Sequence, residues 1–194
     1  MKSRPLEPVT PVITVQELSD WLSGVDITDP LLPFVCESAT DAVIEHLQLE
    51  LVDRAREVVY SQWPTSGTPA CGLSPCNDEY DMTATLPYAG LQSVVKVELF
   101  GDEITTYQVK QSTPSQIRFN AVPAHGIANY DAIKIQYIAG FGDVSDVPSG
   151  IKLAVRNLAA YLYDQRGACA MEDALNMSGA KAMLRTYKTN LVVF

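Results

Sequence analysis

The sequence predicts an α+β protein: a small helical bundle with an inserted antiparallel β-sheet region and an extended C-terminal tail. Helix-prone segments lie near both ends of the chain, and β-prone runs separated by turn residues fill its middle. The hydrophobic period also changes from two residues to about 3.6 within residues 133–167, where the chain returns from strand to helix. With 194 residues, 47% of them hydrophobic, the chain is long enough to bury a core.

The first predicted unit is an extended arm at residues 1–13. It contains three prolines and no helical period, so we expect it to become ordered only against a partner. The first part of the helical body follows at residues 14–50. A capping box formed by Thr14 and Glu17 begins a short helix there.

A longer helix is predicted to start at Asp29 and Pro30. Its expected inward positions follow a helical period: Leu31, Leu32, Val35, Ala39, Ala42, Val43 and Leu47. His46 lies near the end of this helix without a paired Cys, Ser or carboxylate constellation. Its pattern therefore favours pairing with the helix dipole over catalysis.

Residues 51–145 form the predicted antiparallel β region. Arg54–Trp63 is its first strand, and the proline- and glycine-rich residues 64–80 are a long loop. Hairpin turns are expected at Gly101–Asp102 and Pro114–Ser115. The remaining predicted strands are Met82–Leu86, Val94–Phe100, Thr105–Lys110, Gln116–Phe119 and a last strand that opens at Ala132.

The strand–turn–helix segment at residues 133–167 has the clearest pattern in the chain. Ile133, Ile135 and Tyr137 alternate with polar residues, as a half-buried strand requires. Gly140 and Gly142 then free the backbone. Asp146 or Ser149 is expected to cap a helix that holds Pro148 in its first turn, with the apolar stripe Ile151, Ala154, Val155, Leu158 and Leu162.

The second part of the helical body is predicted at residues 146–187, followed by a tail at residues 188–194. Residues 171–187 show a weaker helical pattern with Gly179 inside it. The tail is apolar and β-prone, and two hypotheses stay open for it: adding a strand to a partner's sheet edge, or folding back onto this chain's own sheet or core. The residues expected to mediate docking are Lys181, Arg185, Tyr187, Lys188, Leu191, Val192, Val193 and Phe194.

The net charge of −9 argues against sequence-independent binding of nucleic acid, which requires lysines and arginines to displace counterions. The charge is uneven, because residues 152–194 contain six basic and three acidic side chains. The sequence has no apolar run of about 18 residues and no signal-peptide pattern at its start, so neither a membrane span nor export is predicted.

Catalytic, cofactor and metal motifs are not found. Gly140-Phe141-Gly142 lacks the third glycine of a dinucleotide-binding turn, and the neighbouring Asp143 and Asp146 would repel a pyrophosphate. No serine lies in a nucleophile elbow. Cys71 and Cys76 share one loop with several acids, which leaves a metal- or ligand-binding globular protein as an alternative hypothesis.

Three motifs resemble the head-tail connector (adaptor, or head-completion) proteins of long-tailed double-stranded DNA bacteriophages. They are Tyr137-Ile138-Ala139-Gly140-Phe141-Gly142, Asp146-Val147-Pro148 and Tyr161-Leu162-Tyr163-Asp164-Gln165-Arg166-Gly167. The resemblance covers roughly residues 14–167. Gly140, Gly142, Asp146 and Pro148 are the fold-signature turn that it identifies, whereas the loop at 64–80 and the arm carry no family pattern.

The resemblance implies a structural, non-enzymatic protein of the virion neck, made in the host cytoplasm. It implies a homo-oligomeric ring, expected to be a dodecamer, below the capsid portal protein. Genomic DNA would pass through without sequence-specific binding, and a head-closure or tail-completion protein would follow the ring. The last helix and tail are implied to reach the portal. A different neck or tail-completion ring is the nearest alternative.

Overall fold

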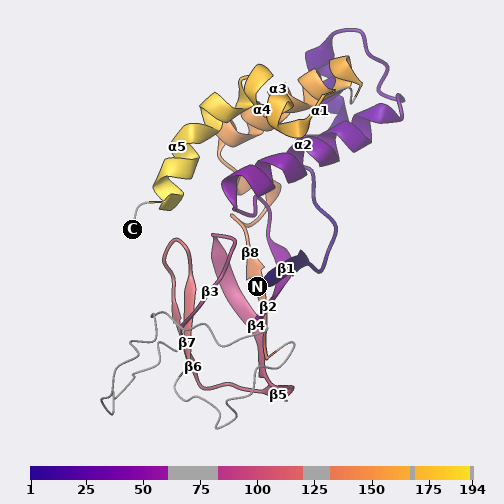
Figure 1. The fold of residues 1–194 in the computed structure, drawn as a ribbon. Helices are drawn as coiled ribbons and strands as arrows, with labels where there is room; N and C mark the ends of the chain where they lie inside the picture. Colours follow the sequence, from indigo (N-terminus) through magenta and orange to yellow (C-terminus); the bar gives the residue numbers. More distant parts are fainter. Residues whose placement is uncertain (61–82, 120–131, 167–168, 193–194) are drawn as a thin grey trace.

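The computed structural model describes residues 1–60, 83–119, 132–166 and 169–192, with side chains described as far as Lys188. The predicted loop at 64–80, with Cys71 and Cys76, lies outside the described residues, as do Gly167, Val193 and Phe194. Helices gather at one end of the molecule and strands at the other, as Figure 1 shows. The predicted α+β class is confirmed.

The helical body is built from both ends of the chain, as the sequence predicts. Two helices precede the β region and three follow it: α1 (Val15–Leu22), α2 (Leu31–Leu47), α3 (Ser149–Gln165), α4 (Met171–Met177) and α5 (Ala180–Val192). The capping box of α1 is confirmed, because the Glu17 amide donates to Thr14 Oγ1 at 3.1 Å and the Thr14 amide donates to Glu17 Oε2 at 2.8 Å. In the described residues, no helix combines the length and apolar character that a membrane span needs.

The inward stripe of α2 differs from the prediction at its first position. Leu31 is exposed and Leu32 is fully buried, so the stripe begins one residue later than expected. Cys36 and Thr40 continue this stripe, although the sequence pattern had not assigned them to it. Thr40 can be buried because its hydroxyl donates to the Cys36 carbonyl, at 2.8 Å.

Gly179 ends the predicted single helix over residues 171–187. The structure has two helices there, since α4 ends at Met177 and α5 begins at Ala180. Gly179 has a φ of +75°, a conformation that suits glycine at the end of a helix. The glycine is therefore a boundary between two helices.

The predicted extended tail is wrong for residues 188–192, which continue α5 to Val192. A strand needs a neighbouring strand to pair its backbone groups, whereas a helix pairs them within its own segment. Extending a formed helix also fixes only one further residue for each new hydrogen bond. The β propensity of these residues is therefore outweighed by the backbone hydrogen bonds of the helix and by the small entropy cost of extending it.

The described residues of the β region form two antiparallel sheets. In the larger sheet β8 (Ile133–Ala139) lies between β2 and β4. Alternate residues from Ile133 to Ala139 are fully buried because they share the face of β8 that packs in the core of the β region. Its strand order is β1 (Lys2–Pro5), β2 (Arg54–Tyr60), β8, β4 (Leu91–Leu99) and β5 (Asp102–Glu103). The smaller sheet has the order β3 (Thr83–Thr85), β7 (Gln116–Phe119) and β6 (Tyr107–Lys110).

The predicted arm is ordered within its own chain, contrary to the expectation that it requires a partner. β1 pairs antiparallel with β2, from Lys2 opposite Val59 to Pro5 opposite Arg56. Val12 and Ile13 are buried in the core of the helical body. Pro5 is tolerated because β1 is the edge strand of the sheet.

Each part of the molecule has its own hydrophobic core. One core joins the five helices, and the other fills the β region around Ile133, Ile135 and Tyr137. Chain connections run between these two parts at 6–14, 49–54, 87–91 and 139–149. The contacts among these connections determine how the two parts are held together.

Candidate functional site

The fold-signature turn lies where the connections between the two cores cross. The Gly140 amide donates to the Gly90 carbonyl at 2.9 Å, and the Asp53 amide donates to the Gly142 carbonyl at 2.9 Å. Asp53 Oδ1 in turn accepts from the Gly142 amide at 2.9 Å. A Cβ atom on Gly140 would lie 2.5 Å from the Asp53 nitrogen, so only glycine fits at this crossing.

Asp146 and Pro148 have roles that differ from the prediction. Asp146 caps a short 3₁₀ turn (Val144–Asp146) by accepting from the Asp143 amide at 3.1 Å, and it does not cap α3. Pro148 precedes the first helical residue of α3, Ser149, and no side chain caps this helix. The φ of Pro148, −54°, is close to the value that its ring imposes.

A buried cluster of charged and aromatic side chains occupies the same junction. Arg56 is 2% exposed, and its Nε donates to Glu50 Oε1, a carboxylate that is itself fully buried. The guanidinium group of Arg56 lies over the Tyr88 ring, 3.3 Å from the ring centroid. The Tyr88 hydroxyl donates to Glu45 Oε1 of α2 at 2.5 Å. The cluster therefore connects strand β2, the segment before β4 and helix α2.

Burial raises the pKa of Glu50, and the guanidinium groups of Arg56 and Arg54 offset part of this effect. Arg54 contributes because its NH1 lies 3.7 Å from Glu50 Oε1. Burial also raises the pKa of Tyr88, to about 12, and that of Tyr137 further. Both phenols are therefore neutral at physiological pH, and the Tyr88 hydroxyl acts as a hydrogen-bond donor.

The sequence analysis did not identify this cluster. It predicts a strand from Arg54, and this is confirmed as far as Tyr60. Arg54 and Arg56 alternate with Ala55 and Glu57, so a strand must place both arginines on one face. The available signal was that Val58 and Tyr60 continue this same face into the core. Two inward arginines require a buried acid, but Asp53 and Glu57 lie nearer in sequence than Glu50, so spacing alone does not select Glu50.

The predicted docking residues of α5 lie on different sides of the helix. Lys181 forms an ion pair with Glu172 of α4, and Tyr187 is half-buried against Gly150, where a Cβ atom would come within 2.5 Å of the Tyr187 hydroxyl. Arg185 and Lys188 are exposed. Leu191 and Val192 belong to the last turn of α5, while Val193 and Phe194 lie outside the described part of the chain.

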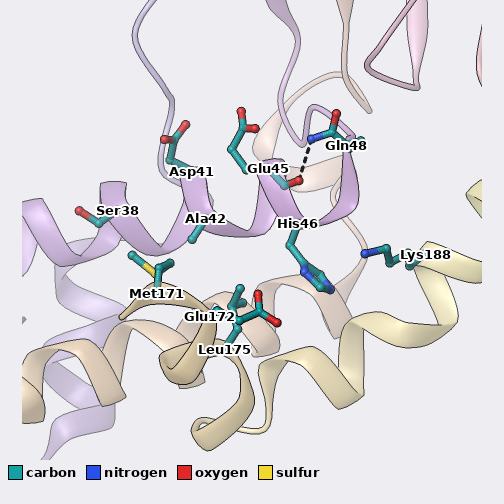
Figure 2. Close-up of a pocket in the computed structure, with 10 residues that line it drawn as sticks. All are labelled: Ser38, Asp41, Ala42, Glu45, His46, Gln48, Met171, Glu172, Leu175 and Lys188. Carbon is teal, nitrogen blue, oxygen red and sulfur yellow. Dashed lines mark hydrogen bonds between the residues drawn. The ribbon is translucent and has the colours of Figure 1, made fainter. Parts of the chain in front are cut away.

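Lys188 borders a groove of about 670 Å³ between α2, α4 and α5, shown in Figure 2. Its wall from α2 carries Asp41, Glu45 and His46, and Glu172 lies opposite on α4. Burial and the nearby Lys188 lower the pKa of His46, so its ring is neutral at physiological pH. His46 lies in the last turn of α2, where the sequence predicts a partner of the helix dipole, and a neutral ring interacts with that dipole only weakly.

The described residues do not assemble a metal-binding group. Within 1–60, 83–119, 132–166 and 169–192, no three His, Cys, Asp or Glu side chains are grouped so that they could hold a metal ion. Cys36 is buried, and burial raises the pKa of its thiol to about 11, which makes it a poor nucleophile. The fold defines an α+β protein with a helical body and an antiparallel β region.

Comparison with known proteins finds similarity at the level of fold. No family model and no curated protein matches the sequence. A chain in the neck of an empty gene transfer agent (GTA) particle, computed with C6 symmetry, aligns with a TM-score of 0.67 and 19% identity, over 92% of this chain and 95% of that chain. The neck of a native GTA particle computed with C12 symmetry contains a chain with a TM-score of 0.63 and 21% identity, over 94% of both chains.

A third similar chain belongs to the virion of a native GTA particle. It aligns with a TM-score of 0.62 and 18% identity, over 91% of this chain and 94% of that chain. At these identities the comparisons establish a shared fold. The alignments extend over both the helical body and the β region, so the whole architecture is shared.

Proposed function

We propose that this chain is a structural protein of the neck of a phage-like particle, where copies of it form a ring between the capsid portal and the tail or head-closure proteins. The observation that carries the proposal is the fold shared, over more than nine-tenths of both chains, with a chain from a particle neck computed with C6 symmetry and with one computed with C12 symmetry. The connector motifs of the sequence support it independently. A ring of twelve copies is the expected assembly.

The charge of the chain is compatible with a ring through which DNA moves. A net charge of −9 keeps attraction to the phosphate backbone weak, so DNA would slide without being held. No catalytic role is proposed, and the site consists of surfaces for protein contacts. Localisation in the virion neck follows from this role.

Electron microscopy of the purified protein mixed with the portal of the same particle tests this role. We expect a ring of density at the exit of the portal channel, coaxial with it. Portals that remain bare at saturating protein would contradict the proposal. A ring on the tail alone would assign the chain to the tail-completion position.

We further propose that the end of α5 and the residues after it dock onto the portal. Arg185 and Lys188 are exposed near this end, and they would steer it toward an acidic surface. The buried residues that anchor α5, Ala180 and Leu184, lie earlier in the helix. We therefore expect that the docking end can be removed without unfolding the chain.

A chain that ends at Tyr187 is expected to keep its melting temperature and to lose portal binding. Tyr187 remains in this variant, so its packing against Gly150 is preserved. Thermal denaturation and co-sedimentation with portal rings measure the two properties separately. A truncated chain that unfolds would assign the tail to the core, and one that still binds would place the docking surface elsewhere.

A further inference from the structure

Two exposed apolar patches lie on the helical body. The first, here called the α2 face, contains Leu31, Phe34 and Met171, and Phe34 is 67% exposed. The second, here called the α3 face, contains Trp21, Leu153 and Met183, and Trp21 is 51% exposed. Two residues of α3 connect the members of the α3 face: the guanidinium group of Arg156 lies over the Trp21 ring, and the Asn157 side chain contacts Met183.

The two faces point away from each other. α2 and α3 contribute their buried stripes to the same core, so the outer side of each helix is directed away from that core. With 100° of rotation per residue, Phe34 lies roughly 160° around α2 from the centre of its buried stripe. Leu153 lies roughly 170° around α3 from the centre of its own stripe. The α2 face and the α3 face therefore lie on opposite sides of the helical body.

The charges beside these apolar residues have opposite signs. On α2, Glu37 and Asp41 follow Phe34 by three and seven residues, and both are exposed. On α3, Lys152 precedes Leu153 and Arg156 follows it by three residues. Glu17 neutralises part of the positive charge on the α3 face, since these two cations lower its pKa together with its capping hydrogen bonds. Glu37 and Asp41 thus give the α2 face an acidic rim, which Arg166 partly offsets. Lys152 and Arg156 give the α3 face a basic rim, which Glu17 and Asp20 partly offset.

We propose that the α2 face of one copy binds the α3 face of the next copy, so that these faces form the side-to-side interface of the ring. This inference rests on the proposed ring function and names the surfaces that build it. A twofold dimer would bury one face and leave the other exposed to water, whereas a head-to-tail interface buries both. A ring with many copies turns little between neighbours, so it needs interfaces on nearly opposite sides of each copy. Apolar centres with charged rims are the expected composition of such an interface.

The test combines two variants that each damage one face. Phe34→Glu places a charge in the α2 face, and Leu153→Glu places one in the α3 face. Both side chains are exposed, so we expect the variants to fold, which unchanged circular dichroism melting curves would verify. Val95→Glu is the matched control, because Val95 is a 59% exposed apolar residue of β4 in the β region, away from both faces.

Sedimentation velocity is measured for each variant alone and for an equimolar mixture. We expect wild type and Val95→Glu to associate beyond dimers, and each face variant alone to remain monomeric. The mixture is expected to form dimers and nothing larger, because the intact α3 face of Phe34→Glu can bind the intact α2 face of Leu153→Glu only once. This pattern is specific to a head-to-tail contact.

Three results would overturn the inference. Face variants that associate like wild type would show that the ring uses other surfaces, while the neck function would stand. A mixture that stays monomeric while wild type associates would show that the two faces do not bind each other. A wild-type chain that remains monomeric at its highest soluble concentration, and that also forms no ring on portals, would remove both the interface and the proposed function.

Discussion

Replacing Arg56 by methionine is expected to lower the free energy of unfolding by about 3–5 kcal/mol, because it leaves the buried carboxylate of Glu50 without its closest cation. Methionine fills much of the same volume, so the loss arises mainly from the unpaired charge. Arg54, with its NH1 at 3.7 Å from Glu50 Oε1, compensates part of it and favours the lower end of this range. Urea denaturation at neutral pH measures the change.

The loss in Arg56→Met should depend on pH in a defined direction. Burial already raises the pKa of Glu50, and removing Arg56 raises it further, so the folded variant binds a proton that the unfolded chain releases. Stability from this group is then fully present below the unfolded pKa of about 4.3 and is lost as the pH rises through the folded pKa. The difference from wild type should be smallest near pH 4 and grow toward neutral pH.

Two further variants isolate the buried charge. Arg4→Met removes an arginine whose NH2 lies 2.7 Å from Glu57, but this arginine is 70% exposed, so less than about 1 kcal/mol is expected. Adding Glu50→Gln to Arg56→Met removes the unpaired carboxylate and should recover part of the stability and abolish the pH dependence. A loss of stability in Arg56→Met that does not depend on pH would contradict this explanation. It would mean that the packing of Arg56 on Tyr88 contributes more to stability than its ion pair with Glu50.

The elements with strong local patterns could be predicted from the sequence. The capping box of α1, the alternation in β8 and the apolar stripe of α3 each combine a start signal with a matching period, and all three are confirmed. β7 was predicted with the bounds that it has in the structure, Gln116–Phe119. In these elements local propensity and burial favour the same structure, so a single sequence is sufficient.

The errors at the N-terminal arm and at the junction cluster occur where a tertiary contact decides, whereas the error at the C-terminus has a local cause. Residues 1–13 have no helical period and resemble a free arm, but the edge of β2 offers backbone groups that Lys2–Pro5 can pair with. The C-terminal residues have β propensity, but α5 supplies backbone pairing without a partner strand. The junction cluster was missed because Glu50, Arg56 and Tyr88 are separated in sequence, and only the fold brings them together.

The fold-signature turn shows how a sequence motif and a structural role correspond. Gly140 and Gly142 were identified from the sequence as residues that free the backbone between strand and helix. The structure adds the reason for Gly140, which is the close approach of Asp53 from the connection at 49–54. That reason could not be inferred from spacing, because Asp53 lies more than eighty residues away. It leads directly to a substitution with a large expected effect.

Gly140→Ala is expected to destabilise the chain by about 4 kcal/mol or more, which is exceptional for a single added methyl group. The new Cβ would lie 2.5 Å from the backbone nitrogen of Asp53 and 2.6 Å from its Cα, so backbone must move. Movement would also strain the hydrogen bonds from the Gly140 amide to Gly90 and from the Asp53 amide to Gly142, both 2.9 Å long. Thermal and urea denaturation measure the loss.

Gly101→Ala provides the matched control for this prediction. Gly101 has a φ of +97°, but a Cβ there would meet nothing within 4 Å, so alanine incurs only the backbone strain, about 1–2 kcal/mol. Hydrogen exchange adds a local readout, because the Asp53 and Gly142 amides should exchange faster in Gly140→Ala and unchanged in Gly101→Ala. Equal losses of stability in the two variants, with the Asp53 and Gly142 amides still protected, would contradict the prediction. They would mean that the backbone segments of Asp53 and Gly140 can move apart at no cost in free energy. The turn would then be only a flexible link between the helical body and the β region.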